Sequence, residues 1–229
     1  MSDIPSVKIC GLTNAADARD ALRLGADTIG FIFYDKSPRY IKPEKAKLLI
    51  EDLRFSEKTV KKFLSVKRNV IVTGVFVNED PLKLRKIIEY ADIDIVQLSG
   101  NEPVEYIEKL GIDKKFIIKA VHVKTKGDAD KIFLYKNAGV NVLIDAFANG
   151  GKFGGTGIRV STDLLNGLNM NDIILAGGID ETNVESIVKS VKPYGLDLSS
   201  KIESFPGKKN IDKMILFFKN LRRAADEIA

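Results

Sequence analysis

The sequence predicts one (β/α)8 barrel, the TIM-barrel fold of the α/β class, spanning residues 1–229 as a single domain. Eight short β-branched segments alternate with segments of helical spacing along the whole chain, and 229 residues suit a barrel near the small end of its range. Helical crossovers between successive strands require a parallel sheet. Since no linker or low-complexity tract interrupts the pattern, we expect no domain boundary.

The predicted strands are short β-branched runs that follow one another at regular intervals. They cover residues 7–10, 28–33, 70–77, 94–99, 116–121, 141–146, 172–177 and 194–200. Residues suited to helix N-termini lie between them: Thr13 and Asn14, Pro43, Pro81, Pro103, Thr182, and Asn210. The sixth crossover looks short. A doubly wound open sheet is the alternative fold, but Cys10-Gly11-Leu12-Thr13 after the first strand is not the glycine-rich turn typical of it.

Charge and composition indicate a globular chain without a membrane segment. The 36 basic and 31 acidic residues give a net charge of +5, and the segment 54–68 alone nets +5. We interpret this basic surplus between the second helix and third strand as an extra helical turn or a solvated surface excursion. Nucleic-acid binding is the alternative, testable by a salt-dependent gel shift, but we expect no nucleic-acid partner. Cys10, the single cysteine, excludes an intrachain disulfide and suits a reducing compartment, so we expect a cytoplasmic protein without a secretory signal.

Several polar residues are predicted to face the barrel axis, because side chains alternate along a strand and the apolar partners should face the helices. These candidates are Lys8 and Cys10, Gln97 and Ser99, Asp145 (which shares its face with Leu143), Asp197 and Ser199, and Lys119. Polar groups at strand carboxyl ends lie at the mouth, where barrel enzymes do chemistry. The alternative is an ion-pair cluster of Lys8, Asp145 and Asp197 that is only structural.

Glycine and serine clusters follow the late strands. They are Gly154-Gly155-Thr156-Gly157, Gly177-Gly178 and Ser199-Ser200. Backbone N–H groups at such turns can hold a phosphate, and barrels usually place that site after strands seven and eight. The sequence therefore predicts a phosphorylated small-molecule ligand. One cysteine and one histidine provide no metal-ligand set, and no serine-hydrolase motif is present.

An ordered set of motifs, each after the appropriate strand, resembles the phosphoribosylanthranilate isomerase family of tryptophan biosynthesis over nearly the whole chain. The motifs are KICG (8–11), GFIF (30–33), KSPRYI (36–41), VFVN (75–78), VQL (96–98), GGTG (154–157), LAGG (175–178) with NV (183–184), DLSSKIE (197–203) and PGKK (206–209). The family usually has His-Gly after VQL, whereas this chain has Ser99-Gly100. That change leaves a substrate-orienting detail open.

The resemblance implies an Amadori rearrangement of N-(5-phosphoribosyl)anthranilate to 1-(2-carboxyphenylamino)-1-deoxyribulose 5-phosphate, without cofactor or metal. It implies that Cys10 is the general base, that Asp145 is the general acid, and that Arg39 holds the anthranilate carboxylate. The implied phosphate-binding residues are Gly155, Gly177, Gly178, Ser199 and Ser200. Lys8, Gln97 and Asp197 are possible supporting residues, and the family contains monomers and homodimers.

The chemistry requires shifted protonation states. Asp145 must be protonated to open the sugar ring, so we expect it to be partly desolvated. Cys10 must form a thiolate, and Lys8 on the same strand face is predicted to lower its pKa. His122 is interpreted as structural or loop-exposed. The rival functions are the sister sugar isomerase of histidine biosynthesis, which has an aspartate where Cys10 stands and repeated phosphate motifs, and a non-catalytic phosphoribosyl sensor.

Overall fold

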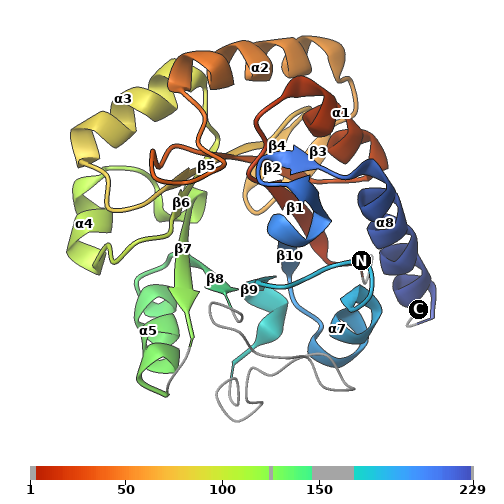
Figure 1. Ribbon diagram of the computed structural model, residues 1–229. Helices are drawn as coiled ribbons and strands as arrows, with labels where there is room; N and C mark the ends of the chain where they lie inside the picture. The colour runs from red at the N-terminus through yellow and green to blue at the C-terminus, as the bar shows by residue number, and fades with distance from the viewer. Residues whose placement is uncertain (1–3, 124–125, 146–167, 228–229) are drawn as a thin grey trace.

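The computed structural model describes residues 4–123, 126–145 and 168–227 and contains a closed barrel of eight parallel strands (Figure 1). The strands are β1 (Ser6–Cys10), β2 (Thr28–Ile32), β5 (Val72–Phe76), β6 (Ile95–Leu98), β7 (Ile117–His122), β8 (Asn141–Asp145), β9 (Ile173–Ala176) and β10 (Gly195–Leu198). The barrel closes because β1 pairs with both β2 and β10. The predicted fold and the eight strand positions are therefore confirmed, with ends that differ by a few residues.

The helices form a ring outside the barrel, as Figure 1 shows. They are α1 (Ala15–Leu24), α2 (Pro43–Ser56), α3 (Pro81–Ala91), α4 (Val104–Lys109), α5 (Lys126–Asn137), α7 (Val184–Val191) and α8 (Ile211–Asp226). The side chains of Asn14 and Asn210 accept hydrogen bonds from first-turn N–H groups, as their type predicts. Asn183, not Thr182, is the N-cap residue of α7. The predicted short sixth crossover lies in residues 146–167, outside the described residues.

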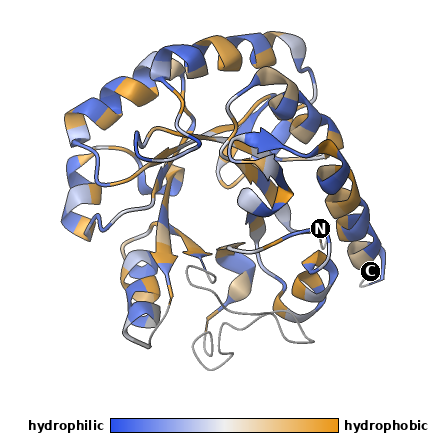
Figure 2. Cartoon of the chain, in the orientation of Figure 1, coloured by the Kyte–Doolittle hydropathy of each residue, from blue (hydrophilic) through white to orange (hydrophobic). Residues whose placement is uncertain are grey.

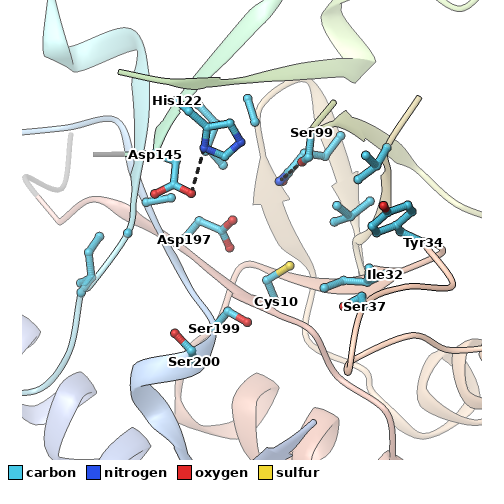
Figure 3. Close-up of a pocket in the computed structure, with 18 of the residues that line it drawn as sticks. Cys10, Ile32, Tyr34, Ser37, Ser99, His122, Asp145, Asp197, Ser199 and Ser200 are labelled. Carbon is cyan, nitrogen blue, oxygen red and sulfur yellow. Dashed lines mark hydrogen bonds and ion pairs between the residues drawn. The ribbon is translucent and has the colours of Figure 1, made fainter. Parts of the chain in front are cut away.

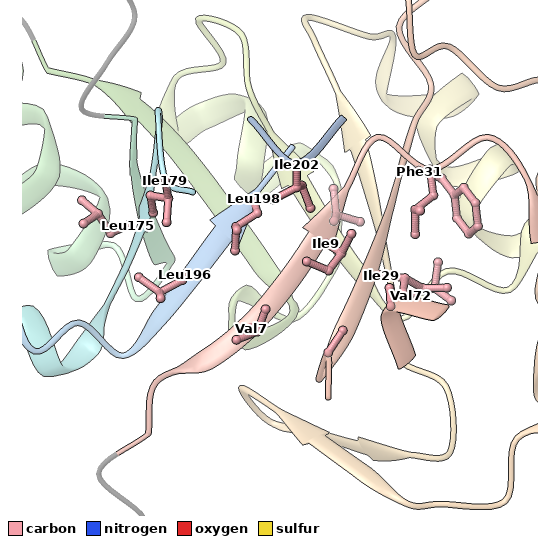
Figure 4. Close-up of a cluster of buried hydrophobic side chains, with 14 of the residues drawn as sticks. Val7, Ile9, Ile29, Phe31, Val72, Leu175, Ile179, Leu196, Leu198 and Ile202 are labelled. Carbon is pink, nitrogen blue, oxygen red and sulfur yellow. The ribbon is translucent and has the colours of Figure 1, made fainter. Parts of the chain in front are cut away.

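The main hydrophobic core lies between the barrel wall and the helices. Its strand residues alternate with inward-facing ones, so that Val7 and Ile9 of β1 pack beside Leu196 and Leu198 of β10 (Figure 4). Apolar residues accordingly concentrate on the strands and on the barrel-facing sides of the helices (Figure 2). None of the described helices is both long enough and apolar enough to span a bilayer.

A hairpin closes the floor of the barrel, below the amino-terminal ends of the strands. It consists of β3 (Lys61–Phe63) and β4 (Val66–Arg68), which pair antiparallel. Phe63 is fully buried and belongs to the same cluster as Ile71, Ile95 and Ile118. The amide of Leu64 donates a hydrogen bond to the Tyr194 hydroxyl, at 2.7 Å, just before β10 begins. The floor is therefore sealed by a side chain from the chain's own basic segment.

This hairpin corrects the interpretation of residues 54–68 as an extra helical turn or a solvated excursion. Residues 54–56 end α2, and the hairpin follows after a short connection. Arg54 and Arg68 form ion pairs with Asp92 and Asp94, at 2.6 and 2.8 Å to Asp94. Three-residue strands are too short to show a period-2 pattern. The many basic residues also favoured an exposed segment, although Phe63 is buried.

A second short hairpin follows β10 on the mouth side of the barrel. After the 3-10 helix η3 (Ser200–Ile202), β11 (Glu203–Phe205) pairs with β12 (Lys208–Lys209). The amide of Lys209 donates to Asp17 at 2.7 Å, and the Thr13 hydroxyl donates to the Gly207 carbonyl at 2.7 Å. These bonds attach the hairpin of the last strand–helix unit to the segment that follows β1. They thereby hold Glu203 at the mouth.

Candidate functional site

A cavity of about 350 Å³ opens at the carboxyl ends of the barrel strands (Figure 3). All eight strands contribute to its walls, as do the loops after β2, β5, β9 and β10. The polar side chains on its walls are Cys10, Tyr34, Ser37, Gln97, Ser99, His122, Asp145, Asp197, Ser199, Ser200 and Lys201. One cavity therefore brings together residues from both ends of the sequence, which is the usual arrangement of a barrel active site.

The strand alternation places most predicted residues where they were expected. Cys10, Gln97, Asp145, Asp197 and Ser199 all line the cavity. The predicted axial position of Lys119 is wrong.

Lys119 lies on the opposite face of β7, because Ile118 and Ala120 are the residues of this strand in the interior cluster. Its ammonium donates to Glu102 at 3.0 Å and to the Gly100 carbonyl at 2.7 Å, outside the barrel. Both faces of β7 are buried, so its sequence does not show which face points to the axis, and the prediction placed Lys119 on the wrong one.

Cys10 lies at the end of β1 with its side chain buried. Burial raises the pKa of the Cys10 thiol above its ordinary value, while the positive charges of Lys8 and Lys209 oppose that rise. The predicted influence of Lys8 thus has the expected direction, but desolvation outweighs it. In the free protein at neutral pH, Cys10 is a thiol with two buried ammonium groups close enough to stabilise a thiolate.

Lys8 and Asp197 form a buried ion pair beneath Cys10. Both carboxylate oxygens of Asp197 accept hydrogen bonds from the Lys8 ammonium, each at 2.9 Å. Burial alone would lower the pKa of Lys8, but attraction to Asp197 and Cys10 raises it overall. Lys8 therefore keeps its charge inside the barrel, and that charge is shared between the carboxylate and the thiol.

Asp145 ends β8 and keeps 29% of its side chain exposed, which agrees with the partial desolvation expected for it. Its Oδ2 lies 3.3 Å from Nδ1 of His122, on the adjacent strand β7. Figure 3 shows this pair on one side of the cavity, with Asp197 between Asp145 and Cys10. Strands β9 and β10 separate the acid and base candidates, so the two groups can reach different atoms of one sugar.

His122 is the residue that sequence reasoning missed. It was interpreted as structural or loop-exposed, yet it lines the cavity as the last residue of β7. The hydrogen bond with Asp145 is the main reason why the pKa of His122 is raised, and a hydrogen bond with the backbone of Ser99 adds to it. Extending the predicted strand by one residue would have placed His122 on the same face as Ala120. That face lines the cavity in the structure, whereas the prediction had assigned the face of Lys119 to the axis.

Gln97 is buried in the cavity wall and donates a hydrogen bond from Nε2 to the Ser99 hydroxyl at 3.1 Å. Among the described residues, its Oε1 finds no hydrogen-bond donor. A buried amide oxygen without a partner costs free energy. The cavity thus presents an acceptor that a ligand hydroxyl or amine can satisfy.

The predicted phosphate-binding residues gather at one side of the cavity. Gly177, Gly178, Ser199 and Ser200 all line it, after β9 and β10. Both glycines have positive φ, at 90° and 64°, and this conformation is accessible to glycine without strain. Gly155 lies outside the described residues.

Arg39 stands at the edge of the mouth and does not line the cavity wall. Its Nε donates to both carboxylate oxygens of Glu203, at 2.9 and 3.0 Å, and its Nη2 donates at 2.6 Å. Lys209 also contacts Glu203, at 2.8 Å. Although burial would raise the pKa of Glu203, these hydrogen bonds hold it below the usual value.

Gly11, which follows β1, leaves the space that the Arg39 side chain occupies. The Gly11 backbone has φ of +75°, and a Cβ there would come within 2.5 Å of Arg39 Cδ. Nη1 of Arg39 makes no hydrogen bond within the part of the chain that the structure describes. The guanidinium is therefore held rigidly by one carboxylate while one amino group stays available to another.

Comparison with known proteins gives a consistent result. A family model described as N-(5'-phosphoribosyl)anthranilate (PRA) isomerase matches residues 7–220. The chain is 38% identical over 214 residues to the N-(5'-phosphoribosyl)anthranilate isomerase of Sulfurihydrogenibium sp., which covers 92% of this chain and 96% of that protein.

Solved structures of similar proteins have the same architecture. Monomers generated from the dimeric phosphoribosylanthranilate isomerase of Thermotoga maritima superpose with a TM-score of 0.76 at 34% identity, covering 96% of this chain and 99% of the other. A phosphoribosyl anthranilate isomerase in complex with reduced 1-(o-carboxyphenylamino)-1-deoxyribulose 5-phosphate also gives 0.76, at 33% identity, covering 96% of this chain and all of the other.

Proposed function

Because the chain belongs to the N-(5'-phosphoribosyl)anthranilate isomerase family of tryptophan biosynthesis, an aldose–ketose type of isomerase, we propose that it catalyses an Amadori rearrangement by general acid–base catalysis. The substrate is N-(5-phosphoribosyl)anthranilate and the product is 1-(2-carboxyphenylamino)-1-deoxyribulose 5-phosphate. The single observation that carries this proposal is the placement of Cys10 and Asp145 in one cavity, separated by two strands.

Ring opening is assigned to Asp145. The carboxyl group donates a proton to the furanose oxygen as the C1–O bond breaks, and the nitrogen lone pair forms the C1=N bond of a Schiff base. A general acid of this kind contributes about 10²–10⁴-fold to a rate. The side chain keeps some exposure, so a sugar entering the cavity can reach it.

Proton abstraction from C2 is assigned to Cys10. The thiolate takes the C2 proton, the C–H electron pair forms C1=C2, and the C1=N pair returns to nitrogen to give an enolamine. Loss of the enol hydroxyl proton and protonation at C1 then give the ketone. Lys8 and Lys209 support the thiolate, since their charges lower the pKa of Cys10 against the effect of burial.

Substrate orientation is assigned to the two polar ends of the cavity. The phosphate binds at Gly177, Gly178, Ser199 and Ser200, with Gly155 as a further proposed contact. Arg39 holds the anthranilate carboxylate through Nη1, while Glu203 fixes the guanidinium plane. Gln97 accepts a hydrogen bond from the ligand through its unpaired Oε1.

The reaction as proposed uses no cofactor or metal and acts on a small molecule. We propose a cytoplasmic protein, a monomer or homodimer, with no nucleic-acid partner. The pairing of Arg54 and Arg68 with Asp92 and Asp94 supports the last point, because it neutralises part of the basic segment.

An isomerase assay tests this proposal. The fluorescent anthranilate–ribose substrate is generated in place, and its decay is followed with the intact protein and with Cys10→Ala and Asp145→Ala. We expect fast decay with the intact protein and decay near the uncatalysed rate with both variants. An intact, folded protein without activity would overturn the proposal and favour the histidine-pathway isomerase or a ligand sensor, which binding of phosphorylated sugars would then distinguish.

A further inference from the structure

The general acid of the proposed reaction poses a problem that the structure itself raises. Asp145 must be protonated to act, but an ordinary aspartate is ionised at neutral pH. The nearby imidazole of His122, 3.3 Å away, favours the ionised carboxylate still more, since its charged form is stabilised by this same contact. This contact therefore favours a shared proton on the imidazole nitrogen over the carboxylate oxygen.

We propose, on the basis of the proposed function, that His122 is a positioning residue that stores the proton which Asp145 delivers to the sugar ring. When a ligand fills the cavity and displaces water, the proton on Nδ1 moves to Oδ2, leaving a neutral imidazole and a neutral carboxyl group. The carboxyl group then donates this proton to the ring oxygen. The enol hydroxyl proton, released as the ketone forms, restores the pair, so the protons balance over one turnover.

The surroundings of the pair favour proton transfer from His122 to Asp145 when a ligand fills the cavity. A neutral pair is favoured over an ion pair when water is excluded, because charge separation is costly at low dielectric. The backbone of Ser99 holds the ring through a hydrogen bond, so that Nδ1 stays directed at Asp145. A distance of 3.3 Å between Nδ1 and Oδ2 allows proton transfer after a small shortening of the contact.

Other charges around the imidazole have partners of their own. Lys119, on the same strand, opposes protonation of His122 but is engaged with Glu102 on the outer face. Asp197 lies between Asp145 and Cys10 on the cavity wall. Its carboxylate is paired with the Lys8 ammonium.

On the outer side of β7, Asp128 and Lys131 of α5 share a second pocket with His122 and contact each other at 2.9 Å. Lys201 lies on the wall of the main cavity. Of these groups, the imidazole is the one that contacts Asp145 directly, so it is the group best placed to supply its proton.

The first test measures the proton itself and requires no activity. His122 is the only histidine in the chain, so its imidazole NMR signals are unambiguous. We expect the pKa of His122 to lie above its ordinary 6.5 in the intact protein and to fall towards that value in Asp145→Asn. A His122 pKa that is unchanged by Asp145→Asn would overturn the proposal, whatever the protein catalyses.

The second test uses two substitutions at His122. Asn keeps an N–H donor near the position of Nδ1 but cannot titrate, and Ala removes both functions. The active form needs a protonated acid and a Cys10 thiolate together. In the intact protein the acid is the His122–Asp145 pair, which keeps its proton up to the raised pKa of His122. Without the imidazole, Asp145 must hold the proton alone, with the lower pKa of a carboxyl group, so a smaller fraction of the protein has both groups correctly protonated at neutral pH.

We therefore expect kcat/KM of His122→Asn to drop at least about tenfold, one pKa unit, and the lower limb of the pH profile to move to lower pH. His122→Ala should lose more. Activity of His122→Asn within twofold of the intact protein, or an equal loss at every pH without movement of the limb, would overturn proton storage. An inactive intact protein would instead contradict the proposed function, while the NMR result would still stand.

Discussion

The two ends of the barrel differ in the polarity of their inward side chains and in their openness to solvent. At the floor, Phe63 and the first residues of the strands form a dry cluster sealed by the hairpin β3–β4. At the mouth, a buried thiol, amide and carboxylate and a more exposed imidazole surround an open cavity. The same eight strands build both ends, so the difference lies in a few inward positions, which are apolar in the layer around Phe63 and mostly polar at the strand ends. Stability and chemistry are thereby separated along one axis.

The largest stability effect is expected at the floor. Phe63→Ala removes a fully buried ring from a site that neighbouring strands hold open, so the free energy of unfolding should fall by about 3–5 kcal/mol. The kcat/KM of the folded variant should remain within about twofold, because the mouth is unaffected. Urea unfolding and the isomerase assay check both points. Phe55→Ala is the matched control, since this nearby phenylalanine is 82% exposed; equal losses for both variants would contradict a sealed floor.

The region between the two ends should respond in both properties. Lys8→Met leaves Asp197 buried without its cation, which should destabilise the protein by about 3 kcal/mol. It should also raise the pKa of Cys10 further, because the charge that opposes burial is lost. The pH dependence of thiol alkylation would then shift to higher pH.

Two controls sharpen the Lys8 experiment. A Lys8→Met/Asp197→Leu double variant should regain much of the lost stability, since it replaces the buried pair by apolar groups. An unchanged thiol pKa in Lys8→Met would show that Lys8 stabilises the fold alone and does not act on Cys10.

The smallest effect is expected from Tyr194→Phe. The substitution keeps the ring beside Phe63 but removes the hydroxyl that accepts a hydrogen bond from the Leu64 amide. A part-buried N–H group left without its partner should cost about 1 kcal/mol in urea unfolding. Activity should not change. A loss of activity without a loss of stability would mean that the floor influences the mouth, contrary to the separation described above.

The sequence predicted the mouth better than the floor, for physical reasons. Strand alternation and glycine clusters act over many residues, so Cys10, Asp145 and Asp197 could be assigned to one cavity before any contact was known. The floor depends on one phenylalanine in a three-residue strand, a pattern too short to detect. His122 was missed because the strand end was placed at residue 121 and because the axial face of the strand was assigned to Lys119, which would turn residue 122 outward. Lys119 was misplaced because both faces of β7 are buried and no alternation distinguishes them.

Other features could not be predicted from sequence because they depend on contacts between distant segments. Glu203 holds Arg39 across 164 positions of sequence, and Asp17 receives the Lys209 amide across 192. Neither pairing leaves a local pattern. The motif containing Arg39 indicated a carboxylate-binding residue, but only the structure shows that one carboxylate already fixes it.

The most direct test of the account is the activity of the Asp145→Asn variant, measured together with its free energy of unfolding. The amide has nearly the shape of the carboxyl group but cannot deliver a proton at neutral pH. If chemistry resides at the mouth and stability elsewhere, kcat/KM should fall by at least about a hundredfold while the free energy of unfolding changes by less than about 1 kcal/mol. Activity within tenfold of the intact protein, or a loss of activity that only follows a loss of stability, would contradict the account.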